Sequence, residues 1–282
     1  YYSEDPYLAA RMAVAYIKGL QSKGIGASIK HFACNNSEYE RMTISSEVDE
    51  RALHEIYYPA FKAAVTEAGA WTVMSSYNRI NGVSAAHRRP MLTDLLKNTW
   101  GFTGFVVSDW GGVYDRVAAA NAGCDLEMPW RGDFQIQELL NAVRSGQVSE
   151  SQIDDKVGRI LGVIARAGLF DRQDMPSPPT TNTPERRRLA FEVACEGMVL
   201  LKNRDGLLPL TEKGITSIAV VGPAATMALI QGGGSARVEP YYAVTPLEGL
   251  RKRCPAAIKL TYEQGCSIDG SLPVLDATLV SL

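Results

Sequence analysis

The stretch GFVVSDWGG, residues 104–112, places a single acid at the end of a run of strand-forming residues. Asp109 is followed by Trp110 and then by two glycines. An indole can form an apolar wall on which a sugar ring stacks, and a carboxylate held near an anomeric carbon can act as a nucleophile. The alternative is structural, because an Asp between a strand and a helix often caps the helix or forms a turn.

Lys30 and His31 form a second polar pair, at the end of a short β-like run over residues 27–32. This is a denser polar cluster than a core accepts without partners. Neighbouring strand residues point to opposite faces, so the strand must end or bend for both side chains to face one site. Arg41 follows in the same segment and could either reach back to His31 or be solvated.

Helical and strand-like periodicities alternate along the first part of the chain. They predict helices at 6–21, 49–68, 90–99, 112–122, 133–145 and 149–168, and strands at 27–32, 71–78 and 104–110, with a short fourth strand at 124–129. Asp49 is predicted to cap the second helix. Strands that alternate with helices indicate βαβ units and a parallel sheet.

Polar side chains stand where these strands end. They are Lys30 and His31, Tyr77 and Asn78, Asp109 and Trp110, and, in the short fourth strand, Asp125 and Glu127. In a (β/α)8 barrel the active site lies at the C-terminal ends of the strands. About four βα units are visible where closure needs eight, so the fold is either an open sheet or the later part of a barrel.

The second part of the chain has the pattern of another α/β domain. Helices are predicted at 184–196 and 245–253, strands at 217–223 and 257–263, and a flexible loop at 232–235; the strand at 217–223 has the pattern of a buried strand. The stretch between the two parts is rich in Pro, Ser, Thr and Asp, as linkers are. We therefore predict a first domain at 1–169, a linker at 170–184 and a second domain at 185–282.

Composition excludes several classes of protein. The net charge is −2 without a run of Lys or Arg, which disfavours nucleic acid and anionic membranes as partners. No apolar stretch approaches the roughly 20 residues of a membrane helix. The GGGSAR stretch lacks the spacing of a phosphate loop, which argues against a nucleotide-binding enzyme. The five cysteines have neither metal-ligand nor disulfide-scaffold spacing, and we expect most of them to be buried thiols.

Five ordered motifs carry a family resemblance. KHFACNNSEYER, VMSSYNRINGV, GFVVSDWGG, AGCDLEMP and LLKNRDGLLPL together resemble glycoside hydrolase family 3, and most of all its β-glucosidase branch. The resemblance covers essentially the whole chain. It implies an α/β fold in which the C-terminal part of a (β/α)8-type (TIM-like) barrel is followed by the start of an α/β sandwich domain, with the active site between them.

The same resemblance implies roles for particular residues. Asp109 would be the catalytic nucleophile. Lys30, His31 and Arg41 would bind the hydroxyls of the glycosyl unit, with Tyr77 near the nucleophile, Trp110 lining the subsite and Ser235 on a loop of the second domain. The family needs no metal and no organic cofactor.

The implied reaction is retaining hydrolysis. The nucleophile forms a glycosyl-enzyme, while a second carboxylic acid first protonates the leaving group and then activates water. In the family that acid/base Glu lies beyond the point where this chain ends, and Glu127, Glu239 and Glu263 are not in the matching motif. We therefore expect a piece of a longer polypeptide, inactive alone, that needs the rest of that polypeptide to complete its fold. Its tail, residues 265–282, resembles the stretch where some members carry an inserted PA14 module.

The motifs narrow the substrate. KHFACNN departs from the KHFPGHG pattern of the family's N-acetylglucosaminidases, and SDW departs from the SDS or SDC of the β-xylosidase branch. The leading hypothesis is an exo-acting β-glucosidase for β-glucosides or gluco-oligosaccharides, as in cellulose degradation. The alternatives are a non-catalytic sugar-binding fragment and a related β-glycosidase such as a β-xylosidase. A homo-oligomer and a secreted or periplasmic location are both compatible with these hypotheses.

Overall fold

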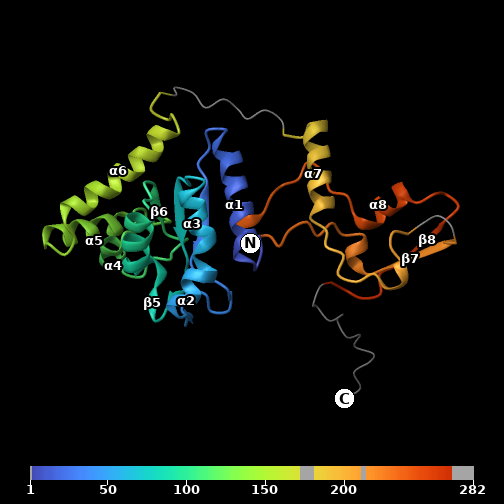
Figure 1. Ribbon diagram of the computed structural model, residues 1–282, viewed down its shortest axis with the longest axis horizontal. Coiled ribbons are helices and arrows are strands. Elements are labelled where there is room, and N and C mark those ends of the chain that lie inside the picture. The colour runs from blue at the N-terminus through green and yellow to red at the C-terminus, as the bar shows by residue number, and fades with distance from the viewer. Residues whose placement is uncertain (1, 172–180, 211–213, 269–282) are drawn as a thin grey trace, which may run out of the picture. The chain divides into compact units, whose positions relative to one another are not determined.

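A computed structural model describes residues 2–171, 181–210 and 214–268 (Figure 1). The chain divides into two compact units, residues 1–175 and 176–282. Most of the predicted linker and the tail assigned to a PA14 insertion lie outside the described residues. No helix in the described part is both long and apolar enough to cross a membrane.

The first unit is built on a parallel sheet. Its strands β1 (Ser28–Phe32), β3 (Thr72–Ser75) and β6 (Phe105–Val107) lie in the order β1-β3-β6, and Leu126 continues the sheet by a parallel bridge to Val107. The helices around it are α1 (Pro6–Gln21), α2 (Glu50–Ala52), α3 (Pro59–Thr66), α4 (Arg116–Ala122), α5 (Asp133–Arg144) and α6 (Glu150–Arg166), with π-helical segments η1 (Leu53–Tyr57) and η3 (Pro90–Thr99). The predicted alternation of strands and helices is confirmed.

Two predicted helices differ in detail. The single helix expected at 49–68 is divided, because Pro59 cannot donate a backbone hydrogen bond and starts a new helical segment. Its predicted cap is confirmed, since Asp49 accepts a hydrogen bond from the Ala52 N–H at 2.8 Å. The helix expected from 112 begins at Arg116 instead, and Asp115 is its N-cap. The strand predicted at 124–129 is reduced to the bridge at Leu126.

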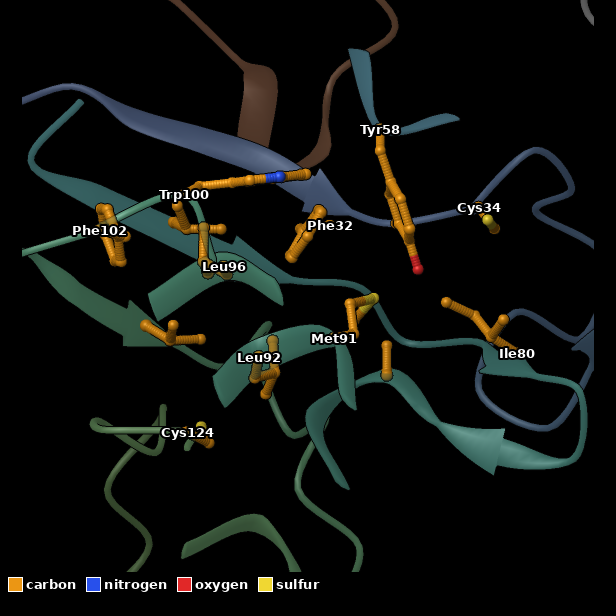
Figure 2. Close-up of a cluster of buried hydrophobic side chains, with 14 of the residues drawn as sticks. Phe32, Cys34, Tyr58, Ile80, Met91, Leu92, Leu96, Trp100, Phe102 and Cys124 are labelled. Atoms are coloured by element: carbon orange, nitrogen blue, oxygen red, sulfur yellow. The ribbon is translucent and has the colours of Figure 1, made fainter. Parts of the chain in front are cut away.

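An aromatic cluster at the end of β1 anchors the sheet to its helices (Figure 2). Phe32 is fully buried, with ring centroids 5.7 Å from Tyr58, 4.9 Å from Phe61 and 5.9 Å from Trp100. Burying each such side chain contributes about 1.5–3 kcal/mol. The cluster therefore fixes the end of β1, where Lys30 and His31 stand.

Gly104 allows β3 and β6 to approach. A Cβ at this position would lie 1.9 Å from the Trp71 carbonyl oxygen, so any larger residue would push the two segments apart. Glycine is therefore needed at position 104 for steric reasons. The close approach that it allows also sets the position of β6 and of Asp109, which follows β6.

The first unit also contains a small second sheet, which was not predicted from the sequence. It consists of β2 (Ser45–Ser46), β4 (Arg79–Ile80) and β5 (Val83–Ser84), and β4 and β5 form a hairpin through Asn81 and Gly82. Both turn residues have positive φ, and Asn-Gly is the strongest short-range hairpin signal. Both polar groups of the Asn81 side chain are used, because its oxygen accepts the Val48 N–H and its amide donates to the Val48 carbonyl, each at 2.8 Å.

The second unit contains α7 (Pro184–Glu196), β7 (Ser217–Val221), α8 (Pro246–Arg253) and β8 (Lys259–Glu263), with 3-10 turns η4 (Arg204–Gly206), η5 (Pro223–Ala225) and η6 (Gly234–Ala236). β7 and β8 pair in parallel. The prediction of a buried strand is wrong, because β7 alternates between exposed and half-buried residues. Within the described residues this sheet has only two strands, and the side chains of both are exposed or half-buried.

The expectation that most cysteines are buried is also wrong. Cys34 and Cys124 are buried, whereas Cys195 and Cys266 are exposed and Cys254 is intermediate. The three that are not buried belong to the second unit, whose described residues bury few apolar side chains.

A buried cluster of charges joins β6 to two helical segments. The side chain of Asp125 is 0% exposed, and its Oδ1 lies 2.6 Å from Lys97 Nζ and 3.7 Å from Lys156 Nζ. Its Oδ2 accepts the Val106 N–H at 2.7 Å. Burial lowers the pKa of Lys156, and the Asp125 carboxylate opposes that shift. One carboxylate therefore compensates two buried ammonium groups.

We expect Asp125→Asn to lower the free energy of unfolding by about 3–5 kcal/mol, because it leaves the buried Lys156 ammonium without an ion-pair partner among the described residues and Lys97 with only the half-exposed Asp155, 3.8 Å away. Asp155→Asn is the matched control, since the Asp155 side chain is 50% exposed, and it should cost less than about 1 kcal/mol. Urea denaturation measures both. Equal losses for the two variants would contradict the central position of Asp125.

Candidate active site

The ends of β1, β3 and β6 bring predicted site residues together. In the parallel register Phe32 is opposite Ser75 and Met74 is opposite Val107, so the three strands end at the same edge of the sheet. His31 Nε2 lies 3.3 Å from Asp109 Oδ2. The convergence of His31 and Asp109, which are far apart in the sequence, follows from the register of parallel strands.

The Asp109 carboxylate is buried, and only one of its two oxygens accepts a hydrogen bond from the described residues. The residue is 8% exposed, and its Oδ1 accepts the Trp110 N–H at 2.7 Å. Its Oδ2 accepts no hydrogen bond from the described residues. A buried polar atom without a hydrogen bond is rare in proteins and calls for an explanation, of which a catalytic role is one. Asp109 does not cap a helix, because Asp115 caps α4 by accepting the Ala118 N–H at 2.8 Å.

Tyr77 connects the end of β3 to the Asp109 loop. Its hydroxyl donates to the Trp110 carbonyl at 2.9 Å, and the Tyr114 hydroxyl donates to the Tyr77 carbonyl at 3.2 Å. Burial, together with the nearby Asp109 carboxylate, raises the pKa of Tyr77 to about 12. Tyr77 is therefore a neutral hydrogen-bond donor near neutral pH.

Arg41 reaches back to the site from its loop. Its guanidinium carbon lies 4.9 Å from the centre of the Tyr77 ring, and its Nη1 lies 2.5 Å from Glu38 Oε2. The buried Asn35 donates to Glu38 Oε1 at 3.3 Å. Glu38 thus orients Arg41 over Tyr77. Glu38 was not among the predicted site residues, although an acid three residues before a candidate arginine was a usable signal.

The environment of His31 keeps its imidazole neutral. Burial lowers the pKa of His31 below its ordinary 6.5; the Asp109 carboxylate opposes this shift, and the Lys30 ammonium adds to it. The contact between His31 and Asp109 is therefore that of a neutral imidazole with a carboxylate. Because the folded state disfavours the protonated form, stability falls as the pH drops below about 6.5.

The remaining predicted residues are more open. Lys30 is exposed and forms no ion pair within the described residues, but it lines, with His31 and Glu38, a cavity of about 1020 Å³ beside β1. Trp110 is 56% exposed. Ser235 lies in turn η6 of the second unit, so its part in this site stays a prediction.

The segment that begins at the Leu126 bridge, where Glu127 was grouped with the other strand-end residues, supports Asp109 through hydrogen bonds that were not predicted. The Ser108 N–H donates to the Leu126 carbonyl at 2.9 Å, the Met128 N–H to Ser108 Oγ at 2.9 Å, and the Gly111 N–H to the Met128 carbonyl at 2.7 Å. The segment 126–131 therefore holds the residues on both sides of Asp109.

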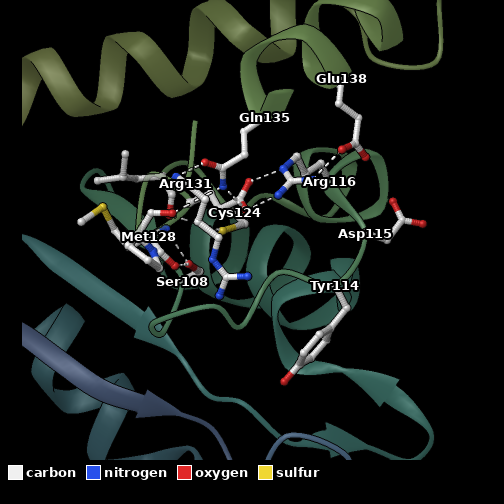
Figure 3. Close-up of polar contacts among 12 residues, drawn as sticks. Ser108, Tyr114, Asp115, Arg116, Cys124, Met128, Arg131, Gln135 and Glu138 are labelled. Atoms are coloured by element: carbon white, nitrogen blue, oxygen red, sulfur yellow. Dashed lines mark hydrogen bonds and ion pairs between the residues drawn. The ribbon is translucent and has the colours of Figure 1, made fainter. Parts of the chain in front are cut away.

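A polar network fixes that segment in turn (Figure 3). Arg116 pairs with Glu127 through two hydrogen bonds of 2.8 and 2.9 Å and with Glu138 at 2.5 Å. Gln135 donates to Glu127 at 2.6 Å and accepts the Arg131 N–H at 2.6 Å. Glu127 therefore has a structural role, as the hydrogen-bond acceptor for Arg116 and Gln135. No group of three or more His, Cys, Asp and Glu side chains in the described ranges could hold a metal ion.

Comparison with known proteins identifies similar chains. The model described as "Glycosyl hydrolase family 3 N terminal domain" matches residues 1–163, and the corresponding C-terminal domain model matches residues 198–274. A β-glucosidase of Rhizobium radiobacter is 47% identical over 94% of this chain and 32% of its own length. An exo-alpha-(1->6)-L-arabinopyranosidase of Bifidobacterium breve is 39% identical over 95% of this chain and 35% of its own length.

A solved structure is also similar. β-Glucosidase 3B of Thermotoga neapolitana in complex with glucose has a TM-score of 0.83 and 38% identity, over 93% of this chain and 36% of that one. The likeness confirms the predicted α/β fold, whose first unit is part of a (β/α)8-type barrel. The chain spans about a third of the length of the curated relatives that it matches.

The electrostatics of His31 provide a test of the site geometry. We expect Asp109→Asn to lower the pKa of His31 further, because it removes the negative charge that opposes the effect of burial, and Lys30→Met to raise it. NMR titration of labelled histidine rings measures both shifts. The pKa of His87, which is set by burial and by Asp115 and Arg79, should not move. A His31 pKa that is insensitive to both variants would contradict the arrangement.

Proposed function

The chain belongs to glycosyl hydrolase family 3, and on that premise we propose that the polypeptide that carries it is a retaining, exo-acting β-glucosidase. One observation carries the proposal. Asp109, at the end of β6, has a buried carboxylate oxygen with no hydrogen bond from the described residues, 3.3 Å from His31. An oxygen held in this way suits attack on a carbon atom of a bound substrate.

In the proposed reaction Asp109 Oδ2 attacks the anomeric carbon, and the bond from that carbon to the leaving-group oxygen breaks. A carboxylic acid from outside residues 1–282 protonates the leaving group. Water, deprotonated by the same acid residue, then attacks the glycosyl-enzyme and releases the sugar. The Trp110 N–H on Oδ1 supports this assignment of roles, because it leaves Oδ2 as the reacting atom.

The residues around Asp109 would recognise the sugar. The neutral imidazole of His31, the ammonium of Lys30 and the guanidinium of Arg41 supply hydrogen-bond donors for hydroxyl groups. Tyr77 remains a neutral donor and fixes the Trp110 backbone, while the exposed Trp110 indole offers a stacking surface. Ser235 would contribute to sugar binding from the second domain. The proposal includes the predicted division into a first domain at 1–169, a linker at 170–184 and a second domain at 185–282.

A second candidate is another exo-acting glycosidase activity of the same family. The support for it is the Bifidobacterium breve relative, whose name is that of an arabinopyranosidase. Comparing kcat/KM for aryl glycosides of glucose, xylose and arabinopyranose separates the two, and the β-glucosidase proposal requires the glucoside to be preferred.

Replacing the nucleophile tests the mechanism. In the full-length polypeptide we expect Asp109→Asn to lower kcat/KM for an aryl β-glucoside by roughly 10³-fold or more, because no covalent intermediate forms. A 2-fluoro-glucoside should label the peptide that contains Asp109. Asp115→Asn is the matched control, since asparagine caps a helix about as well as aspartate, and it should keep kcat/KM. Near-normal turnover by Asp109→Asn, or a label on another peptide, would refute the assignment.

A further inference from the structure

The Asp109 loop, residues 109–115, folds back onto Asp109 before the chain enters α4. The Gly112 N–H donates to the Asp109 carbonyl at 2.9 Å. A Cβ built on Gly112 would lie 3.3 Å from that carbonyl oxygen, 3.5 Å from the Tyr77 ring and 3.6 Å from the Asp109 Cβ. The backbone at position 112 therefore lies close against both residues, so the path of this loop affects the position of the candidate nucleophile.

The far end of the Asp109 loop is held by one imidazole nitrogen. The Tyr114 N–H and the Asp115 N–H both donate to His87 Nε2, each at 3.3 Å. The rings of His87 and Tyr114 meet edge to face, with centroids 6.1 Å apart. Figure 3 shows Tyr114 and Asp115 at the end of the loop. His87 thereby fixes the point at which the chain leaves the site and α4 begins.

Tyr114 extends this contact to the site itself. Its hydroxyl donates to the Tyr77 carbonyl at 3.2 Å, and the Tyr77 hydroxyl donates to the Trp110 carbonyl at 2.9 Å. Trp110 in turn supplies the N–H that occupies Asp109 Oδ1. A chain of hydrogen bonds through two tyrosines therefore connects His87 to the Asp109 carboxylate.

The small second sheet carries His87 to this position. His87 is the last residue of the 3-10 turn η2 (Ala85–His87), which follows β5 directly. Ala85 and Ala86 are fully buried, and the Ala85 N–H donates to the Asn78 carbonyl at 3.1 Å. The turn is therefore anchored in the core, and the half-buried His87 ring is an acceptor in a fixed place.

The two hydrogen bonds to Nε2 require a neutral ring, because a neutral imidazole has one acceptor nitrogen and the protonated form has none. Burial lowers the pKa of His87; the Asp115 carboxylate at the start of α4 opposes this shift, and the Arg79 guanidinium of β4 adds to it. Burial also raises the pKa of Tyr114, which stays uncharged. The acceptor is therefore present near neutral pH and is lost when the pH falls through the pKa of His87.

We propose that His87 is a positioning residue of the active site, which holds the Asp109 loop in its reactive path while its Nε2 accepts the Tyr114 and Asp115 N–H groups. The inference rests on the proposed glycosidase function. His87 takes no part in bond breaking. Its protonation releases the end of the loop, so activity falls on the acid side as these two hydrogen bonds are lost.

The test compares His87→Gln, whose amide oxygen supplies an acceptor that does not titrate, with His87→Leu, which supplies none. In the full-length polypeptide at about pH 7.5, we expect His87→Gln to keep kcat/KM for an aryl β-glucoside within about threefold. His87→Leu should lower it by about tenfold, because two backbone N–H groups lose their acceptor. His54→Gln is the matched control, since the His54 side chain is 54% exposed, and it should follow the wild type at every pH.

The pH profile separates positioning from general stability. Below about pH 6.5 the wild type should lose kcat/KM relative to His87→Gln, by about threefold near pH 5. The midpoint of that relative loss should equal the His87 pKa from an NMR titration. Asp115→Asn removes the charge that opposes burial, so it should lower both values together. A ratio that stays constant with pH, or a midpoint that does not follow the His87 pKa, would overturn the inference.

Hydrogen exchange adds a measurement that needs no turnover. At about pH 7.5 the peptide that contains Tyr114 and Asp115 should exchange faster in His87→Leu than in His87→Gln. Equal exchange in the two variants, or wild-type activity in His87→Leu, refutes the role of His87 alone. A wild type that hydrolyses no glucoside refutes the proposed function instead. If His87→Leu does not fold, the pH profiles of the wild type and His87→Gln decide the question.

Discussion

A carboxylate oxygen held in a protein interior without a hydrogen bond is costly, and the first unit is organised around one such oxygen, Oδ2 of Asp109. The Trp110 N–H occupies the other oxygen, so the side chain cannot turn to relieve the deficit without losing that bond. Below it, Gly104 sets the separation of β3 and β6. Behind it, segment 126–131 binds the backbone of Ser108 and Gly111. Each contact restricts Asp109 to one orientation.

The fixed orientation of the Asp109 carboxylate is accompanied by different roles for the two neighbouring side chains, Arg41 and His31. Arg41 is attached to Glu38 and lies over Tyr77, so it approaches the site without pairing with the carboxylate. His31 approaches most closely, and burial keeps it in the form that has one donor and one acceptor. The site therefore presents a carboxylate beside a neutral donor, which suits an uncharged substrate rich in hydroxyl groups.

The strand ends could be predicted from the sequence because their signals are local: a short apolar run followed by polar residues. Their convergence then follows from parallel pairing, which is why Lys30, His31, Tyr77 and Asp109 could be grouped in advance. The support from segment 126–131 could not, since two of its three hydrogen bonds described above join backbone groups, which carry no residue-specific signal, and the third goes to the Ser108 hydroxyl. The ambiguity of Asp109 as a helix cap arose because α4 begins at Arg116, later than its apolar pattern suggests. Burial in the second unit depends on neighbouring strands, and local patterns cannot report them.

The β4–β5 hairpin has a consequence for the chemical lifetime of the protein. An asparagine followed by glycine is the pair most prone to spontaneous deamidation, because the glycine nitrogen can attack the side-chain carbonyl. Here the Asn81 amide is clamped at both ends by the backbone of Val48, and the Gly82 N–H donates to Ser45 Oγ at 2.8 Å. Attacking atom and target are held in separate hydrogen bonds. These hydrogen bonds of the β4–β5 turn oppose deamidation of Asn81, because the attack by the Gly82 nitrogen would have to break them.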